Sequence, residues 1–214
     1  MFFRKRMRVP EFLEGRFRDL INQDGVLTLE SFFDEYREMK LKYGYERSPG
    51  KSGADSSLSS DRDLFINRFI GTLLWLMKYR VLGNLFNTPR KLAYLDLTFD
   101  TATPDAVDKT FLYYDTTLIN ETYDIMDIGC KKAYTGDMQK LDKPRFLISP
   151  IWARDVDPHP FRVAARFFIE IIENGPPLGT SEITASDAFI DALVERFKEM
   201  TQKAADVAKG LNIV

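Results

Sequence analysis

Asp155, Asp157 and His159 are the residues whose types and spacing most resemble chemical machinery. Two carboxylates alternate with the only imidazole of the chain, a set that could hold a hard metal ion or exchange protons as acid and base. Asp157 also precedes Pro158 and a helix-like run, and Asp followed by Pro is a common helix start. Helix capping explains the same spacing and is favoured, so these three residues remain secondary catalytic candidates.

Two further sets of residues have side chains that could take part in catalysis, but neither set forms a complete site. Asp96 and Asp100 could add carboxylates to a pocket, although Asp at a strand end is also common turn chemistry. Cys130 is followed by two lysines, which lower a thiol pKa, but no general base lies beside it in the sequence. One Cys and one His exclude a tetrahedral Cys/His zinc site within one chain. We predict no metal site and no cofactor.

Two segments partly match ligand-binding motifs. Residues 44–52 resemble a phosphate-binding loop, but five residues separate Gly44 from Gly50 where the motif has four. Residues 20–31 resemble a calcium-binding loop, but Leu20 and Ser31 stand where calcium needs carboxylates. Neither ligand is predicted. Without a complete catalytic motif, the sequence favours a protein that is not an enzyme.

The beginning of the chain is strongly basic. Residues 1–18 hold six basic and two acidic side chains, whereas the whole chain has a net charge of −2. The overall balance argues against nucleic-acid binding except through this arm. We predict that Arg4, Lys5, Arg6 and Arg8 bind a partner, through either an acidic protein face or the phosphates of a nucleic acid or membrane.

Helical periodicity is clear in the first and last thirds of the chain. Apolar residues at spacings of three and four predict helices at about 29–42, 61–86, 161–174 and over about 23 residues ending at Gly210. The nearly all-apolar second helix is expected at the centre of its domain. We predict an arm at 1–18 and one domain at 19–214, with a flexible Gly/Ser loop at 47–60. The alternative is two subdomains hinged at that loop.

The middle of the chain has a different pattern. Leu95, Leu97 and Phe99 alternate with polar or aromatic residues, which predicts a half-buried strand at 92–99. Further strands are predicted at 110–119, 123–128 and 145–148, with a turn around Pro104. No helix-length pattern separates them, so we expect an antiparallel meander. The predicted fold class is α+β: N-terminal helices, a small antiparallel β-meander in the middle and two C-terminal helices.

Apolar runs and cysteine content indicate the cellular compartment in which the protein is expected. The longest apolar run, Phe69–Met77, is far shorter than the roughly 20 residues of a membrane span. The basic start is not followed by the apolar stretch of a secretory signal. With a single cysteine, the chain is expected in an intracellular, reducing compartment.

Composition and motifs together favour a non-catalytic structural or adaptor subunit of a larger assembly, such as a virion or an organellar complex. The 17 Phe, 9 Tyr and 2 Trp residues provide material for aromatic docking surfaces beside the basic arm. Other protein subunits are the expected partners, in an oligomer or hetero-complex. The alternatives are an enzyme built around Asp155–His159 and a module that binds phosphate or an anionic surface.

Overall fold

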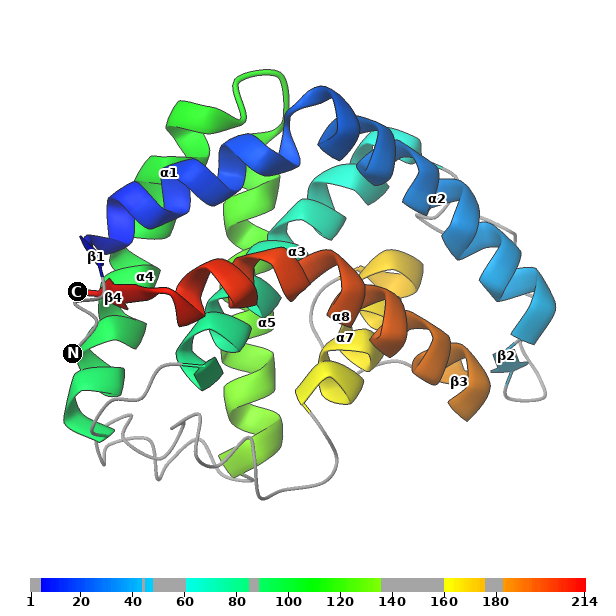
Figure 1. Ribbon diagram of the computed structural model, residues 1–214. Coiled ribbons are helices and arrows are strands. Elements are labelled where there is room, and N and C mark those ends of the chain that lie inside the picture. Colours follow the sequence, from blue (N-terminus) through cyan, green and yellow to red (C-terminus); the bar gives the residue numbers. More distant parts are fainter. Residues whose placement is uncertain (1–4, 44, 48–60, 85–88, 136–159, 176–182) are drawn as a thin grey trace.

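The computed structural model describes residues 5–43, 45–47, 61–84, 89–135, 160–175 and 183–214, and these are mainly helical (Figure 1). The helices are α1 (Val9–Leu20), α2 (Gln23–Tyr43), α3 (Arg62–Asn84), α4 (Pro89–Thr110), α5 (Thr116–Thr135), α7 (Pro160–Asn174) and α8 (Asp187–Lys209). The strands are β1 (Lys5–Met7), β2 (Tyr45–Arg47), β3 (Ile183–Ala185) and β4 (Leu211–Ile213). β1 pairs with β4 in parallel, and β2 pairs with β3 antiparallel.

The central helix is α3, as its apolar sequence predicts. It packs against α2, α4, α5, α7 and α8, and most of its side chains are buried. The Asp61 carboxylate caps its start by accepting a hydrogen bond from the Leu64 amide at 3.0 Å. Although α3 is strongly apolar, no helix in the described residues is long and apolar enough to cross a membrane.

Phenylalanine rings join α3 to three neighbouring helices. The Phe69 ring of α3 lies 4.0 Å, centroid to centroid, from Phe32 of α2 in a stacked arrangement. It also lies 5.7 Å from Phe168 of α7 and 6.1 Å from Phe197 of α8. All four side chains are fully buried. Such pairs add to the free energy of burial, so this cluster holds α2, α3, α7 and α8 together.

The amphipathic helices agree with their sequence patterns. In α2, the predicted stripe includes Leu29, Phe32, Phe33 and Tyr36, which are buried, and Met39, which is partly buried. Gly175 follows α7 with a φ of 70°, a conformation that favours glycine. Ser186 caps α8, where its hydroxyl accepts from the Phe189 amide at 3.2 Å. The helical patterns of α2, α7 and α8 therefore predicted these helices, although α2 begins at Gln23, before the predicted start near residue 29.

The predicted β-meander, and with it the α+β fold class, is wrong. Helix α4 occupies 92–99, and α5 covers the greater part of 110–128, while the predicted strand at 145–148 lies outside the described residues. The buried residues Leu92, Leu95 and Phe99 are spaced by three and four, which is a helical period. Leu97, which completed the apparent alternation, is 48% exposed. The alternation was therefore a local coincidence inside a helical pattern.

Strand-like and turn-like residues are accommodated within α4. Thr98, Thr101 and Thr103 each donate a hydroxyl hydrogen bond of 2.7 Å to the carbonyl four residues earlier. Pro104 lies inside the helix rather than in the predicted turn. Proline lacks the amide that the Asp100 carbonyl would otherwise accept from. Helical packing therefore overrides the local preferences of this segment.

The two ends of the described chain meet at β1 and β4. The Val9 amide donates to the Val214 carbonyl at 3.1 Å, and the Val214 amide donates to the Met7 carbonyl at 3.0 Å. Beyond β1, helix α1 buries Phe12 and Phe17 in the core. Residues from Val9 onward in the basic N-terminal segment are therefore part of the packed structure.

A line of polar or small residues on α3 faces α5. We call Asn67, Arg68, Gly71, Trp75 and Lys78 the α3 seam. Asn67 accepts from the Asp115 amide at 3.1 Å, and Arg68 donates to the Thr122 hydroxyl at 3.4 Å. A Cβ on Gly71 would lie 2.5 Å from the Ile119 carbonyl oxygen. The close approach of α5 to α3 therefore requires glycine at position 71.

Gly71→Ala is expected to lower the free energy of unfolding by at least about 2 kcal/mol, because the added methyl group meets backbone rather than a movable side chain. Gly15→Ala is the matched control within α1, where an added Cβ meets nothing within 4 Å. It should stabilise the protein by about 0.5–1 kcal/mol. Chemical denaturation measures both changes, and equal stabilities of the two variants would contradict this account of the α3–α5 contact.

Candidate functional site

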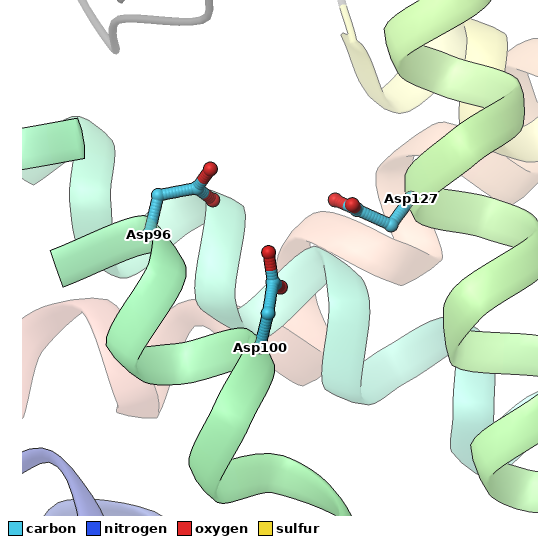
Figure 2. A group of neighbouring side chains, drawn as sticks. All are labelled: Asp96, Asp100 and Asp127. Carbon is cyan, nitrogen blue, oxygen red and sulfur yellow. The ribbon is translucent and has the colours of Figure 1, made fainter. Parts of the chain in front are cut away.

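Lys78 lies among three aspartates where α3, α4 and α5 meet. We call Lys78, Asp96, Asp100 and Asp127 the Lys78 cluster. Asp96 and Asp100 are four residues apart, so they share one face of α4. Figure 2 shows their carboxylates directed toward that of Asp127 on α5. The cluster thus combines residues from three helices.

The ammonium group of Lys78 contacts all three carboxylates. Its Nζ lies 2.6 Å from Asp100 Oδ1, 2.8 Å from Asp127 Oδ1 and 3.0 Å from Asp96 Oδ1. The Lys78 side chain is only 3% exposed. A buried charge is tolerated when it is paired and hydrogen-bonded, and this geometry meets that condition.

Neutral donors supply further hydrogen bonds to the cluster. Trp75 Nε1 donates to Asp127 Oδ1 at 3.0 Å, and the Tyr123 hydroxyl donates to Asp100 Oδ1 at 2.9 Å. Hydrogen bonds to ionised acceptors are stronger than those between neutral groups, so both donors help to stabilise the carboxylates of Asp127 and Asp100.

The surroundings of Lys78 and Tyr123 set the protonation states of these two side chains. Burial lowers the pKa of Lys78, but Tyr123 and the three carboxylates together raise this pKa well above its usual 10.5. Burial also raises the pKa of Tyr123 above its usual 10.0, although Lys78 acts in the opposite direction. Both groups hold their protons at neutral pH. Lys78 is therefore not a neutral amine nucleophile, and Tyr123 is not a base.

The carboxylates of the cluster have the spacing of cation ligands. One oxygen from each aspartate lies within 4.8 Å of the others. Lys78 Nζ already lies within 3.0 Å of all three. A metal ion would have to displace this ammonium group from three partners. We therefore interpret the Lys78 cluster as an internal ion cluster that fixes α4 and α5 on α3.

The structure brings together two of the aspartates considered from sequence. Asp96 and Asp100, suggested as carboxylates of a pocket at a strand end, lie on a helix instead and meet in the Lys78 cluster. Sequence reasoning missed Lys78, Asp127 and Tyr123. The available signal was a lysine directly after the apolar run Phe69–Met77, within the span predicted as one long helix. No local signal connected it to Asp127.

The other predicted site residues lie mostly outside the described residues. Asp155, Asp157 and His159 fall in this category, as does Arg4. Lys5 begins β1, whereas Arg6 and Arg8 have exposed side chains near the paired termini. The catalytic candidates and the partner-binding role of the basic residues stay predictions.

A second site lies where the turn between α4 and α5 passes α2 and α3. Leu112 and Tyr113 in this turn are 71% and 99% exposed. Beside them is a cavity of about 640 Å³, which we call the Tyr113 groove. Its lining consists of Ile21, Val26, Glu30, Asp63, Ile66, Asn67, Thr110, Leu112, Tyr113, Tyr114 and Asp115. These described lining residues include three carboxylates and no basic side chain.

The turn that carries Leu112 and Tyr113 is held on both sides. Phe111 is fully buried and accepts a backbone hydrogen bond from Tyr114 at 3.0 Å. Asp115 caps α5 by accepting from the Leu118 amide at 3.0 Å. Its own amide donates to Asn67 of the α3 seam. The exposed apolar side chains therefore project from an anchored turn.

No family model matches the sequence, and comparison with curated proteins and with solved structures found no match either.

Lys78→Met is expected to lower the free energy of unfolding by about 3–5 kcal/mol, because it leaves three carboxylates without their shared cation. Adding Asp100→Asn should recover part of the loss, because it removes one of the three neighbouring negative charges. Lys198→Met, which breaks an exposed pair with Glu195, should cost less than about 1 kcal/mol. Denaturant titration compares the three variants. A failure of Asp100→Asn to recover any stability would contradict the electrostatic explanation.

The Lys78 cluster should also make the fold sensitive to alkali. A group with a raised folded pKa contributes stability that is complete below its unfolded pKa and is lost as the pH rises through the folded pKa. Lys78 and Tyr123 both have raised pKa values, so the free energy of unfolding should fall as the pH increases beyond about 10.

Tyr123→Phe should make this alkaline loss shallower, because one of the two titrating groups is gone. Tyr113→Phe is the matched control, since Tyr113 is fully exposed outside the cluster. Denaturation midpoints measured from neutral pH to about pH 11 test the difference. Identical pH dependence for Tyr123→Phe and the unmodified protein would contradict the assignment.

Proposed function

We propose that this chain is a non-catalytic subunit or adaptor in a larger protein assembly, and that a partner docks at the Tyr113 groove. The observation that supports this proposal most is the pairing of Leu112 and Tyr113, 71% and 99% exposed, with a cavity of about 640 Å³. Large apolar side chains grouped at a hollow surface are typical of interaction sites. Exposed tyrosine is also enriched at energetically important interface positions.

The charges of the groove define the chemistry of the partner. Glu30, Asp63 and Asp115 line it, its described lining has no basic side chain, and Arg62, outside the lining, lies 3.9 Å from Glu30. A partner segment with Arg or Lys next to an apolar anchor would match both features. The anchor would enter the cavity between α2 and α3, and the basic groups would lie near the carboxylates. Complementary charge chiefly increases the association rate and the specificity of such contacts.

The properties of the Lys78 cluster also support a non-catalytic role. Its lysine and its tyrosine both keep their protons at neutral pH, and the lysine occupies the space among the carboxylates. The most chemical-looking arrangement in the described residues is thus accounted for by packing of α3 against α4 and α5. The surface groove is the better basis for a function.

The double variant Leu112→Ser/Tyr113→Ser is expected to lose its partner without losing stability, because both side chains are exposed. The full chain would be purified gently from its source, and its mass measured by light scattering. The unmodified protein should exceed 24.8 kDa, with partners in fixed stoichiometry, and the double variant should elute at 24.8 kDa. Leu41→Ser is the matched control, since Leu41 is an 87% exposed leucine outside the groove lining.

The charge requirement is tested in the same complex. Glu30→Gln with Asp63→Asn should weaken it and reduce its sensitivity to salt, whereas Glu38→Gln, an exposed change further along α2, should do neither. A monomeric unmodified protein would overturn the proposal. A double serine variant that keeps its partner would show that the groove is not the docking surface.

A further inference from the structure

A second cavity lies on the other side of the α1–α2 junction from the Tyr113 groove. Its volume is about 160 Å³, and residues from α1, α2, α3 and α8 line it. We call it the α1–α8 pocket. Its apolar wall consists of Leu20, Leu29, Leu73, Met77, Met200 and Ala204. A cavity of about 150 Å³ with such a lining can take up a molecule the size of benzene.

Two threonine hydroxyls of the pocket lining already donate to backbone carbonyls. The Thr28 hydroxyl donates to the Asp24 carbonyl at 2.7 Å, and the Thr201 hydroxyl donates to the Phe197 carbonyl at 2.7 Å. A buried water needs two to four polar partners, and the leucine side chains of the wall offer none, so this part of the pocket favours an apolar occupant. Met77 and Met200 add flexible side chains, which adapt easily to the shape of a ligand.

The rim of the pocket is charged. Arg16 Nη1 lies 2.7 Å from Asp19 Oδ2, and Lys203 Nζ lies 3.4 Å from the same oxygen. Two cations thus share one carboxylate, which leaves the rim with a surplus positive charge. Lys203 is 69% exposed, so this surplus faces the solvent. An anionic group at the rim would act as the second counterion.

We infer that the α1–α8 pocket binds a small monoanionic amphiphile: an apolar body of about six carbons, set by the cavity volume, bearing a carboxylate. The body lies against the leucine and methionine side chains. The carboxylate lies at the rim, between Arg16 and Lys203. This site is separate from partner docking at the Tyr113 groove, and the two inferences can fail independently.

Titration of the full chain with hexanoate and with hexanol, followed by NMR, tests the inference, because the two probes have the same six-carbon chain length and differ in charge. Hexanoate should bind saturably and more tightly than hexanol. Lys203→Gln should weaken hexanoate binding about three- to fivefold, the range of an exposed ion pair. Lys209→Gln is the control: another exposed lysine of α8, outside the pocket lining.

Ala204→Leu provides a second test, since it fills the cavity and should abolish binding of both probes. If this variant does not fold, Lys203→Gln still decides the role of the rim. Equal binding of hexanol and hexanoate would overturn the inference. So would unchanged hexanoate affinity in Lys203→Gln, or the absence of saturable hexanoate binding to the unmodified protein.

Discussion

The burial of α3 on nearly all sides is the constraint on which the rest of the fold depends. A helix apolar all round must be enclosed by others, and α2, α4, α5, α7 and α8 do so. Enclosure puts the charged residues Arg68 and Lys78 into a dry environment. Burial lowers the pKa of Arg68, opposed by Glu121 of α5, and the Thr122 hydroxyl of the same helix accepts from Arg68 at 3.4 Å. Lys78 has carboxylate partners, which bind it more strongly. The Lys78 cluster therefore fixes the positions of α4 and α5 on α3.

The α3 seam makes the packing of α5 specific as well as close. Sliding α5 by one turn would remove Asp127 from both Trp75 and Lys78, which it now contacts at 3.0 and 2.8 Å. The same slide would separate Thr122 from Gly71. The phenylalanine cluster provides burial energy but tolerates several arrangements. Directional hydrogen bonds and a required glycine therefore select one register, at the cost of desolvating the charges.

Sequence patterns predicted helices well where apolar residues recur at helical spacing, as in α2, α3, α7 and α8, and poorly where residues with other local preferences interrupt the pattern. The stripe of α2 and the caps of α7 and α8 have strong local signals. In α4, threonines and Pro104 favour other structures locally, and only packing against α1, α3 and α5 explains the helix. The Lys78 cluster was partly visible as Asp96 and Asp100. Asp127 is 49 residues from Lys78, and no spacing rule links positions that far apart.

Two groups of charges have different consequences. Those of the Lys78 cluster are paired inside the fold, whereas Glu30, Asp63 and Lys203 line cavities. The two cavities share the α1–α2 junction, since Gly25 lines one and Val26 lines the other. Asn22 caps this junction by accepting from the Gly25 amide at 2.8 Å, and a Cβ on Gly25 would lie 2.4 Å from the Leu20 carbonyl oxygen. Such a tightly packed junction acts as a rigid wall, so occupation of one cavity should leave the other unchanged.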